Sequence, residues 1–206
     1  MIRRGVDFGI VILAGGDATR LPGKLVADAG ARPMLARVLA NVRDASNEIV
    51  VSTSARLAGE IATIVDVPLV VDRVEARGPL AGMLTALPRM RSPFVFAVAG
   101  DAPFVDASLA RRLSDAWRTG DEAVVPRHLD ANGEAHDEPL AALYDRDAFV
   151  REGVTVFETG RGSMHAVLER LRTRFVRSDE DRALFTNVNT PTDYAAFRMR
   201  IAQEIA

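Results

Sequence analysis

The sequence contains no cysteine, no long apolar run and no marked excess of charge of either sign. The absence of cysteine excludes disulfide bonds, thiolate zinc sites and cysteine nucleophiles, and it fits a cytoplasmic protein. The 26 basic and 28 acidic side chains give a net charge of -2, whereas general nucleic-acid binders usually carry a basic excess. We therefore expect no nucleic-acid partner.

Segments that would cross a membrane or direct export are not recognisable either. The longest apolar runs, such as Phe94–Ala99, fall far short of the roughly 20 residues that span a bilayer. Near the N-terminus, Asp7 follows Arg3 and Arg4 before any long apolar stretch, which is a poor pattern for a signal peptide. We expect a globular protein of the cytoplasm with no membrane association.

The 206 residues, 48% hydrophobic and 26% charged, suffice for one folded domain, which we assign to residues 1–206. Apolar strand-like segments alternate with segments of helical periodicity. Strands are predicted at Phe8–Ala14, Glu48–Thr53, Val67–Asp72, Phe94–Asp101, Glu122–Arg127, Pro139–Asp145 and Thr173–Arg177. Helices are predicted at Pro33–Ala45, Leu57–Val65, Gly78–Met90 (ended or kinked by Pro88), Ala107–Trp117, Ala148–Gly153, Met164–Leu171 and Thr192–Ala206, and a surface loop at His128–Glu138. This order predicts an α/β fold with an open, mainly parallel sheet and helices on both faces.

The stretch VILAGGDATRLPGKL follows the first predicted strand and combines bare backbone with two cations. Gly15 and Gly16 allow backbone N–H groups to approach an anion, and Arg20 and Lys24 can neutralise phosphate charge. The spacing matches neither the dinucleotide fingerprint nor the P-loop. A flexible turn with two solvated cations is the alternative interpretation.

Two aspartates also follow predicted strands, where open sheets present ligands. Asp101 comes after the most apolar strand and can hold Mg²⁺, which in turn holds nucleotide phosphates. The alternative for Asp101 is a helix cap or turn former, although Asp106 is better placed to cap the next helix. Asp72 can bind ribose, base or metal, or simply end its strand.

Two further segments carry candidate contacts. In RGPLAGM, Gly78 and Gly82 stand around a helix start, where backbone can approach a ligand closely; an ordinary turn with a tight helix contact is the alternative. In NVNTP, Asn187 and Asn189 point to one face if the segment is extended. Asn189 or Thr190 can equally be a helix cap.

The three histidines show no spacing typical of metal ligands. We expect His128, His136 and His165 in loops or on helix surfaces. No serine is arranged with histidine and an acid as a nucleophile, so the sequence does not indicate covalent catalysis.

Five segments, in order from residue 10 to about residue 195, resemble motifs of one family. They are LAGGDATRLPGK, GPLAGM, AGDAPFV, EPLAALY and NVNTPTDY. Together they resemble the molybdenum cofactor guanylyltransferases, which are nucleotidyltransferases with a three-layer, Rossmann-like fold of the glycosyltransferase-A type. The resemblance implies that fold, an enzyme, and GTP and molybdopterin as substrates.

The resemblance also implies roles for individual residues. The nucleotide-binding set would be Leu13, Ala14, Gly15, Gly16, Lys24, Ser52, Asp72 and Asp101, with Asp101 also carrying Mg²⁺. Gly78, Gly82, Asn187 and Asn189 would lie near the cofactor substrate or the reaction centre. The chain departs from the family pattern at Gly23, Ser52 and Gly100, where the family often has an acid, an asparagine and a cysteine. These departures leave the phosphate and metal chemistry intact and bear on guanine selectivity.

The predicted reaction is transfer of GMP from GTP to the terminal phosphate of molybdopterin, with release of pyrophosphate. Mg²⁺, Arg20, Lys24 and Asp101 would align and neutralise the phosphates. Cytidylyl transfer to molybdopterin, nucleotidyl transfer to a sugar or polyol phosphate, and a non-catalytic nucleotide-binding module are the alternatives. Molybdenum-insertion proteins and molybdoenzyme chaperones are the expected partners.

Overall fold

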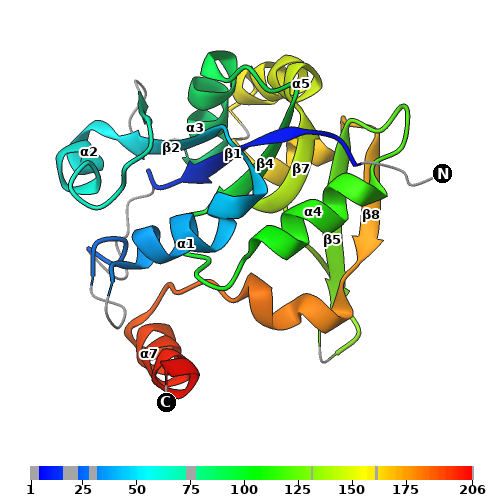
Figure 1. The fold of residues 1–206 in the computed structure, drawn as a ribbon. Coiled ribbons are helices and arrows are strands. Elements are labelled where there is room, and N and C mark those ends of the chain that lie inside the picture. The colour runs from blue at the N-terminus through cyan, green and yellow to red at the C-terminus, as the bar shows by residue number, and fades with distance from the viewer. Residues whose placement is uncertain are drawn as a thin grey trace.

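A twisted β-sheet forms the middle layer of the protein (Figure 1). The computed structural model describes residues 5–15, 23–27, 32–72, 78–130, 132–160 and 162–205, and within these ranges the sheet has eight strands. They are β1 (Phe8–Leu13), β2 (Ile49–Ser54), β3 (Leu69–Asp72), β4 (Phe94–Ala99), β5 (Ala123–Leu129), β6 (Ala135–Asp137), β7 (Ala141–Asp145) and β8 (Thr173–Arg177). Their order is β3-β2-β1-β4-β7-β5-β6, and β8 pairs with β5.

The strand directions decide where a ligand can bind. Strands β3, β2, β1 and β4 are mutually parallel, and β8 is parallel to β5. β7 lies antiparallel between β4 and β5, and β6 is antiparallel to β5. The carboxyl ends of β1 to β5 therefore meet at one edge of the sheet. The predicted α/β fold with a mainly parallel sheet is confirmed.

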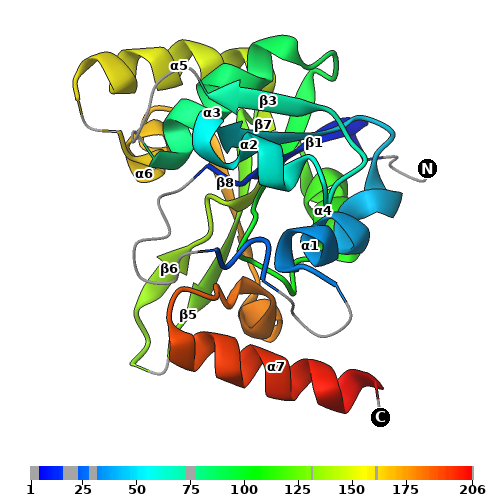
Figure 2. The same cartoon turned by 90° about the vertical axis from the view of Figure 1, so that its left-hand side faces the viewer.

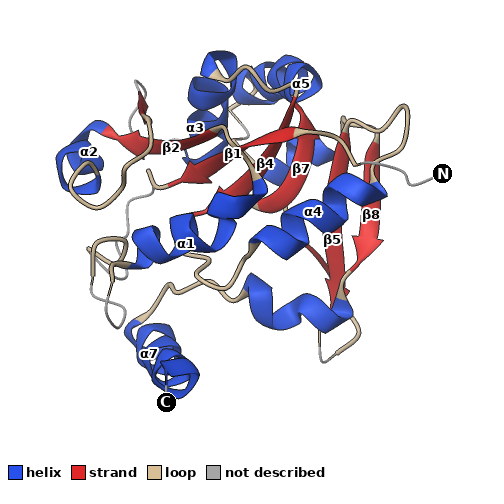
Figure 3. Ribbon diagram, in the orientation of Figure 1, coloured by secondary structure: helices blue, strands red, loops and turns tan. Residues whose placement is uncertain are grey.

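Helices cover both faces of this sheet (Figure 3). They are α1 (Met34–Val42), α2 (Ala55–Ile61), α3 (Gly78–Ala86), α4 (Ala107–Ala116), α5 (Arg146–Glu158), α6 (Met164–Leu168) and α7 (Pro191–Ile205), with short 3-10 turns η1 (Arg43–Ala45), η2 (Leu87–Arg89) and η3 (Asp179–Phe185). α1, α2 and α4 pack on one face, and α3, α5 and α6 on the other. None of the described helices is long and apolar enough to cross a membrane.

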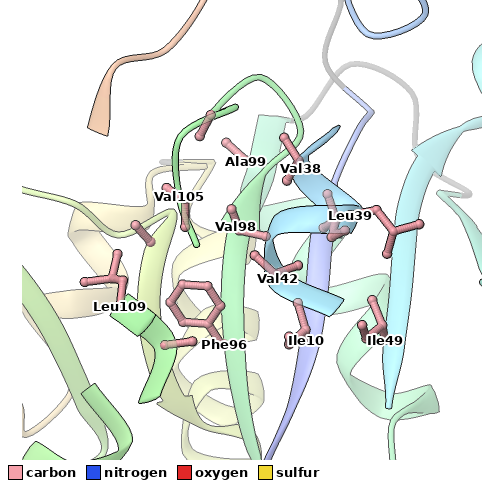
Figure 4. Close-up of a cluster of buried hydrophobic side chains, with 14 of the residues drawn as sticks. Ile10, Val38, Leu39, Val42, Ile49, Phe96, Val98, Ala99, Val105 and Leu109 are labelled. Carbon is pink, nitrogen blue, oxygen red and sulfur yellow. The ribbon is translucent and has the colours of Figure 1, made fainter. Parts of the chain in front are cut away.

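Successive side chains of β1 point to opposite faces of the sheet, and this explains the hydrophobic core on each face. Ile10 and Ile12 face α1, where Leu39 and its neighbours meet them in a cluster (Figure 4). Val11 points to the opposite face and joins Leu80 of α3. Each of these side chains is almost fully buried, which stabilises the fold by about 1.5–3 kcal/mol per side chain.

Helix α7 packs outside these layers and crosses below the rest of the fold (Figure 2). Phe197 and Ile201 of α7 are buried against Met34 and Phe104. The rings of Phe104 and Phe197 meet edge to face with centroids 5.5 Å apart. Val188, just before α7, is fully buried in the same cluster. The end of the chain is thereby fixed beside the carboxyl edge of the sheet.

Several local predictions are confirmed. Asp106 caps α4, because its carboxylate accepts hydrogen bonds from the backbone N–H of Ser108 at 2.9 Å and of Leu109 at 3.0 Å. α3 ends at Ala86 and gives way to η2, which contains Pro88. The helix predicted at 148–153 is longer than expected and spans α5.

The predicted loop at 128–138 is wrong. β5 continues to Leu129 and pairs with β6 in a hairpin. His128 is buried, with its ring stacked between those of His136 and Phe185 at centroid distances of 5.6 Å and 5.4 Å. Its Nε2 lies 2.9 Å from Oε1 of Glu138. The burial of His128 could not be predicted from the polar sequence around it, because Phe185 comes from a distant part of the chain.

Candidate active site

A pocket of about 270 Å³ opens at the carboxyl edge of the sheet. Ten of the predicted site residues line it: Leu13, Ala14, Gly15, Lys24, Ser52, Asp72, Gly78, Gly82, Asp101 and Asn189. Four apolar residues also line it without having been predicted: Leu25, Pro79, Ala99 and Leu140. Leu140 belongs to the EPLAALY segment, and this motif could have indicated that Leu140 lies at the site.

The floor of the pocket is the backbone at the end of β1. Leu13 pairs with strands on both sides, and the N–H of Ala14 donates to the carbonyl of Ser52 at 2.7 Å. A Cβ at Gly15 would lie 3.0 Å from Oδ2 of Asp72, and one at Gly82 would lie 3.1 Å from Oγ of Ser52. A side chain at either position would crowd these groups, so both glycines keep the floor open.

Lys24 is the only lysine in the sequence, and it is buried in this pocket with 8% of its surface exposed. Within the part of the chain that the structure describes, its ammonium donates hydrogen bonds to three oxygens. They are Oδ2 of Asp101, the carbonyl of Val188 at 3.1 Å and Oδ1 of Asn189 at 2.8 Å. An ammonium has three donors on one compact atom, whereas a guanidinium is a flat fork. Three acceptors converging on one point therefore suit lysine and not arginine.

Asp101 lies just beyond β4 and forms an ion pair with Lys24. Its side chain is 21% exposed, so one side of the carboxylate faces the pocket. Its backbone carbonyl accepts a hydrogen bond from the N–H of Val188 at 3.0 Å. Asp101 does not cap α4, since Asp106 does. The carboxylate is therefore left to the pocket and to Lys24.

Asp72 stands on the other side of the pocket, at the end of β3. The hydroxyl of Ser52 lies 2.8 Å from its Oδ1 and 3.2 Å from the carbonyl of Gly82. The carboxyl group is half-buried, and this burial raises the pKa of Asp72, while the hydrogen bond with Ser52 opposes the rise. β2 and β1 lie between β3 and β4, so the strands that lead to Asp72 and Asp101 are about three strand spacings, roughly 14 Å, apart.

The charges of the pocket are therefore arranged along its length. A lysine and an aspartate stand at the β4 end, and an aspartate with a hydroxyl stands at the β3 end. The β4 end can receive phosphates, because Lys24 supplies a cation there. The β3 end has an acceptor suited to N–H groups. This arrangement fits a ligand with an anionic tail and a head that donates hydrogen bonds.

Three of the predicted site residues are not among the described residues that line the pocket. Gly16 and Arg20 lie outside the described residues, and their roles stay predictions. Asn187 is exposed and does not line the pocket, so only Asn189 of the two asparagines reaches it. The carbonyl of Val188, which binds Lys24, was not predicted, because a backbone contact leaves no mark on residue types.

A second group of metal-ligand types lies on the β5–β6 hairpin. The ligand atoms of Asp130, Glu134 and His136 all fall within 4.8 Å of one another. Oδ1 of Asp130 accepts the N–H groups of Asn132 at 2.8 Å and Glu134 at 2.9 Å. Asp130 thus stabilises the hairpin turn, and the group lies outside the pocket.

Comparison with known proteins identifies the family of the chain. Residues 10–174 match the model of the MobA-like NTP transferase domain. The chain belongs to this family. It is a nucleotidyltransferase, and the alternative of a non-catalytic module is set aside. The matched range contains nine of the ten predicted residues that line the pocket, all but Asn189.

Curated relatives that align over more than nine tenths of their length carry consistent names. A molybdenum cofactor guanylyltransferase of Sinorhizobium fredii is 32% identical, covering 93% of this chain and 92% of that protein. A probable molybdenum cofactor guanylyltransferase of Natronomonas pharaonis is 30% identical, covering 93% of this chain and 97% of that protein.

Solved structures show the same fold. Molybdopterin-guanine dinucleotide biosynthesis protein A of Archaeoglobus fulgidus superposes with a TM-score of 0.80 at 22% identity, covering 95% of this chain and all of that one. The 4-diphosphocytidyl-2C-methyl-D-erythritol synthase of Anaerococcus prevotii gives a TM-score of 0.75 at 14% identity, covering 96% of this chain and 99% of that one. At these identities the likeness establishes the fold alone.

Proposed function

We propose that this nucleotidyltransferase transfers GMP from GTP to the terminal phosphate of molybdopterin carrying molybdenum, giving the guanine dinucleotide form of the cofactor and pyrophosphate. The observation that carries the proposal is the distribution of charged groups in the pocket, with Lys24 and Asp101 at one end and Asp72 at the other. The names of the full-length relatives support the choice of substrates.

Guanine is the base that suits the β3 end. It presents two neighbouring donors, N1–H and the N2 amino group, and a carboxylate can accept both at once. Adenine and cytosine offer one amino group beside ring acceptors, which would face the negative charge of Asp72. The Ser52 hydroxyl fixes Oδ1 of that carboxylate. A bidentate contact of this kind discriminates between bases by about 1–3 kcal/mol.

The triphosphate suits the opposite end. Lys24 would exchange one of its acceptors for a phosphate oxygen and so offset charge on the α-phosphate. The donor set there, the Asp101 carboxylate with the amide oxygen of Asn189, consists of hard oxygen ligands of the type that Mg²⁺ prefers together with substrate phosphates. Mg²⁺ held by Asp101 would neutralise phosphate charge during transfer.

The chemistry then needs alignment more than proton transfer. An oxygen of the acceptor phosphate attacks the α-phosphorus, a new P–O bond forms, and the bond to the bridging oxygen of the β-phosphate breaks. The acceptor is already ionised at neutral pH, so no general base is required. Holding both phosphates in line and offsetting their charge supplies the rate enhancement.

The test is a nucleotide panel with the purified protein, Mg²⁺ and molybdenum-loaded molybdopterin. GTP, CTP, ATP and UTP are compared by pyrophosphate release, and the product is identified by mass. We expect turnover with GTP only. Preferential use of CTP would contradict the choice of base, and turnover with a sugar phosphate in place of molybdopterin would contradict the choice of acceptor.

Two variants probe the ends of the pocket. Asp72→Asn should lower kcat/KM for GTP by about tenfold to a hundredfold, because an amide cannot accept both donors of guanine. Asp101→Asn should lower turnover by orders of magnitude at every Mg²⁺ concentration. Asp145→Asn is the control, because Asp145 caps α5 at the opposite edge of the sheet. Loss of activity in the control equal to that in Asp72→Asn would contradict the role of Asp72.

A further inference from the structure

The turn that precedes α7 supplies two of the three acceptors of Lys24. They are the carbonyl of Val188 and Oδ1 of Asn189. The N–H of Val188 donates to the carbonyl of Asp101, so the same turn is also tied to the backbone beside the carboxylate. A lysine has a flexible four-carbon stem. The position of its ammonium is therefore set by these acceptors.

One carboxylate outside the pocket holds this turn. Oδ2 of Asp193, in the first turn of α7, accepts the backbone N–H of Asn189 at 3.0 Å and of Thr190 at 2.8 Å. In turn, Oγ1 of Thr190 accepts a hydrogen bond from the backbone N–H of Asp193 at 3.1 Å. These contacts form a reciprocal helix cap. Backbone hydrogen bonds to the ionised carboxylate, that from Asn189 foremost, lower the pKa of Asp193.

We infer that Asp193 is a positioning residue for nucleotidyl transfer, which fixes the turn Val188–Thr190 so that Asn189 and the Val188 carbonyl hold Lys24 against Asp101. When a nucleotide phosphate replaces one acceptor of Lys24, the acceptors on the turn keep the ammonium in place. Asp193 itself does not line the pocket. The inference concerns Lys24 and the transfer reaction, and it does not depend on which base is used.

The single lysine of the chain makes a direct test possible. Protein labelled with ¹⁵N-lysine gives one side-chain signal, that of the Lys24 ammonium. A buried ammonium with three hydrogen bonds exchanges its protons slowly, and the exchange rate reports how firmly it is held. The measurement uses the full chain without nucleotide, so its result does not depend on the proposed substrate.

Asp193→Ala should speed this proton exchange by about tenfold and lower kcat/KM by about tenfold for the nucleotide that the parent uses best, because a small displacement of a positioned group is costly. Asp193→Asn keeps an acceptor oxygen and should give a smaller change in both measurements. If the alanine variant does not fold, the asparagine variant carries the same comparison.

One control separates positioning from helix capping. Asp145→Ala removes the cap of α5 far from the pocket. It should lower the melting temperature without moving the Lys24 signal or kcat/KM. The inference is wrong if Asp193→Ala or its asparagine counterpart keeps the parent's Lys24 exchange rate and kinetics, or if Asp145→Ala changes them equally.

Discussion

Replacing Lys24 by methionine should destabilise the fold as well as stop catalysis. The side chains of Lys24 and Asp101 are only 10% and 21% exposed. Removing one partner of a buried ion pair costs about 3–5 kcal/mol, since the other charge is left unpaired. The partial exposure of Asp101 lets water compensate for some of this cost. We expect Lys24→Met to lower the free energy of unfolding by about 2–3 kcal/mol.

Asp101→Asn should have a smaller effect of the same sign. A carboxylate that faces a ligand site contributes to stability when it is paired, and Asp101 is paired with Lys24. The asparagine keeps an oxygen for the ammonium but loses the charge, which costs about 1 kcal/mol. The fold should still form.

The double variant distinguishes the ion pair from two independent losses. With both charges removed, neither Lys24 nor Asp101 leaves an unpaired partner. The loss of unfolding free energy in the double variant should therefore be about 2 kcal/mol smaller than the sum of the losses in the two single variants. Urea denaturation of the four proteins measures this coupling, and each 1 kcal/mol should appear as about 2–4 °C in melting temperature. Additivity within about 0.5 kcal/mol would refute the reasoning.

Three further predictions concern the β3 end of the pocket and the core beside it. Burial raises the pKa of Asp72, so nucleotide affinity should fall on acidification at a higher pH than it would for an ordinary aspartate. Ser52→Ala removes the opposing hydrogen bond and should move this fall to a still higher pH. Superimposable plots of affinity against pH for the parent and Ser52→Ala would contradict this. The same raised pKa means that the protonated carboxyl favours the folded state, so its contribution to stability is lost as the pH rises through the pKa of Asp72 in the folded protein. Gly82→Ala should weaken nucleotide binding about tenfold, because the new methyl would lie 3.1 Å from the Ser52 hydroxyl, whereas Gly59→Ala, with nothing within 4 Å, should leave binding unchanged in the same titration. Tyr144→Phe removes a buried 2.7 Å hydrogen bond to a backbone carbonyl and should cost about 1–2 kcal/mol in urea denaturation; an unchanged midpoint would count against that bond.

The sequence alone determined the strand and helix alternation and, through it, the place of the pocket. Parallel strands joined by helices must present their carboxyl ends at one edge, so Gly15, Asp72 and Asp101 were predicted together although they are far apart in the chain, whereas Ser52 was predicted only from the family resemblance. The regular side-chain periods of helices and strands are local properties, and local properties can be read from sequence.

Only the tertiary structure decided what these residues contact. Lys24 is paired with Asp101, 77 residues away, and with Asn189, 165 residues away. His128 is buried because Phe185 stacks on it, and the carbonyl of Val188 reaches Lys24 from just before the last helix. Such contacts depend on strand order and on where the last helix packs. No period or composition of a short segment carries that information, because the partners belong to segments that meet only once the sheet has formed.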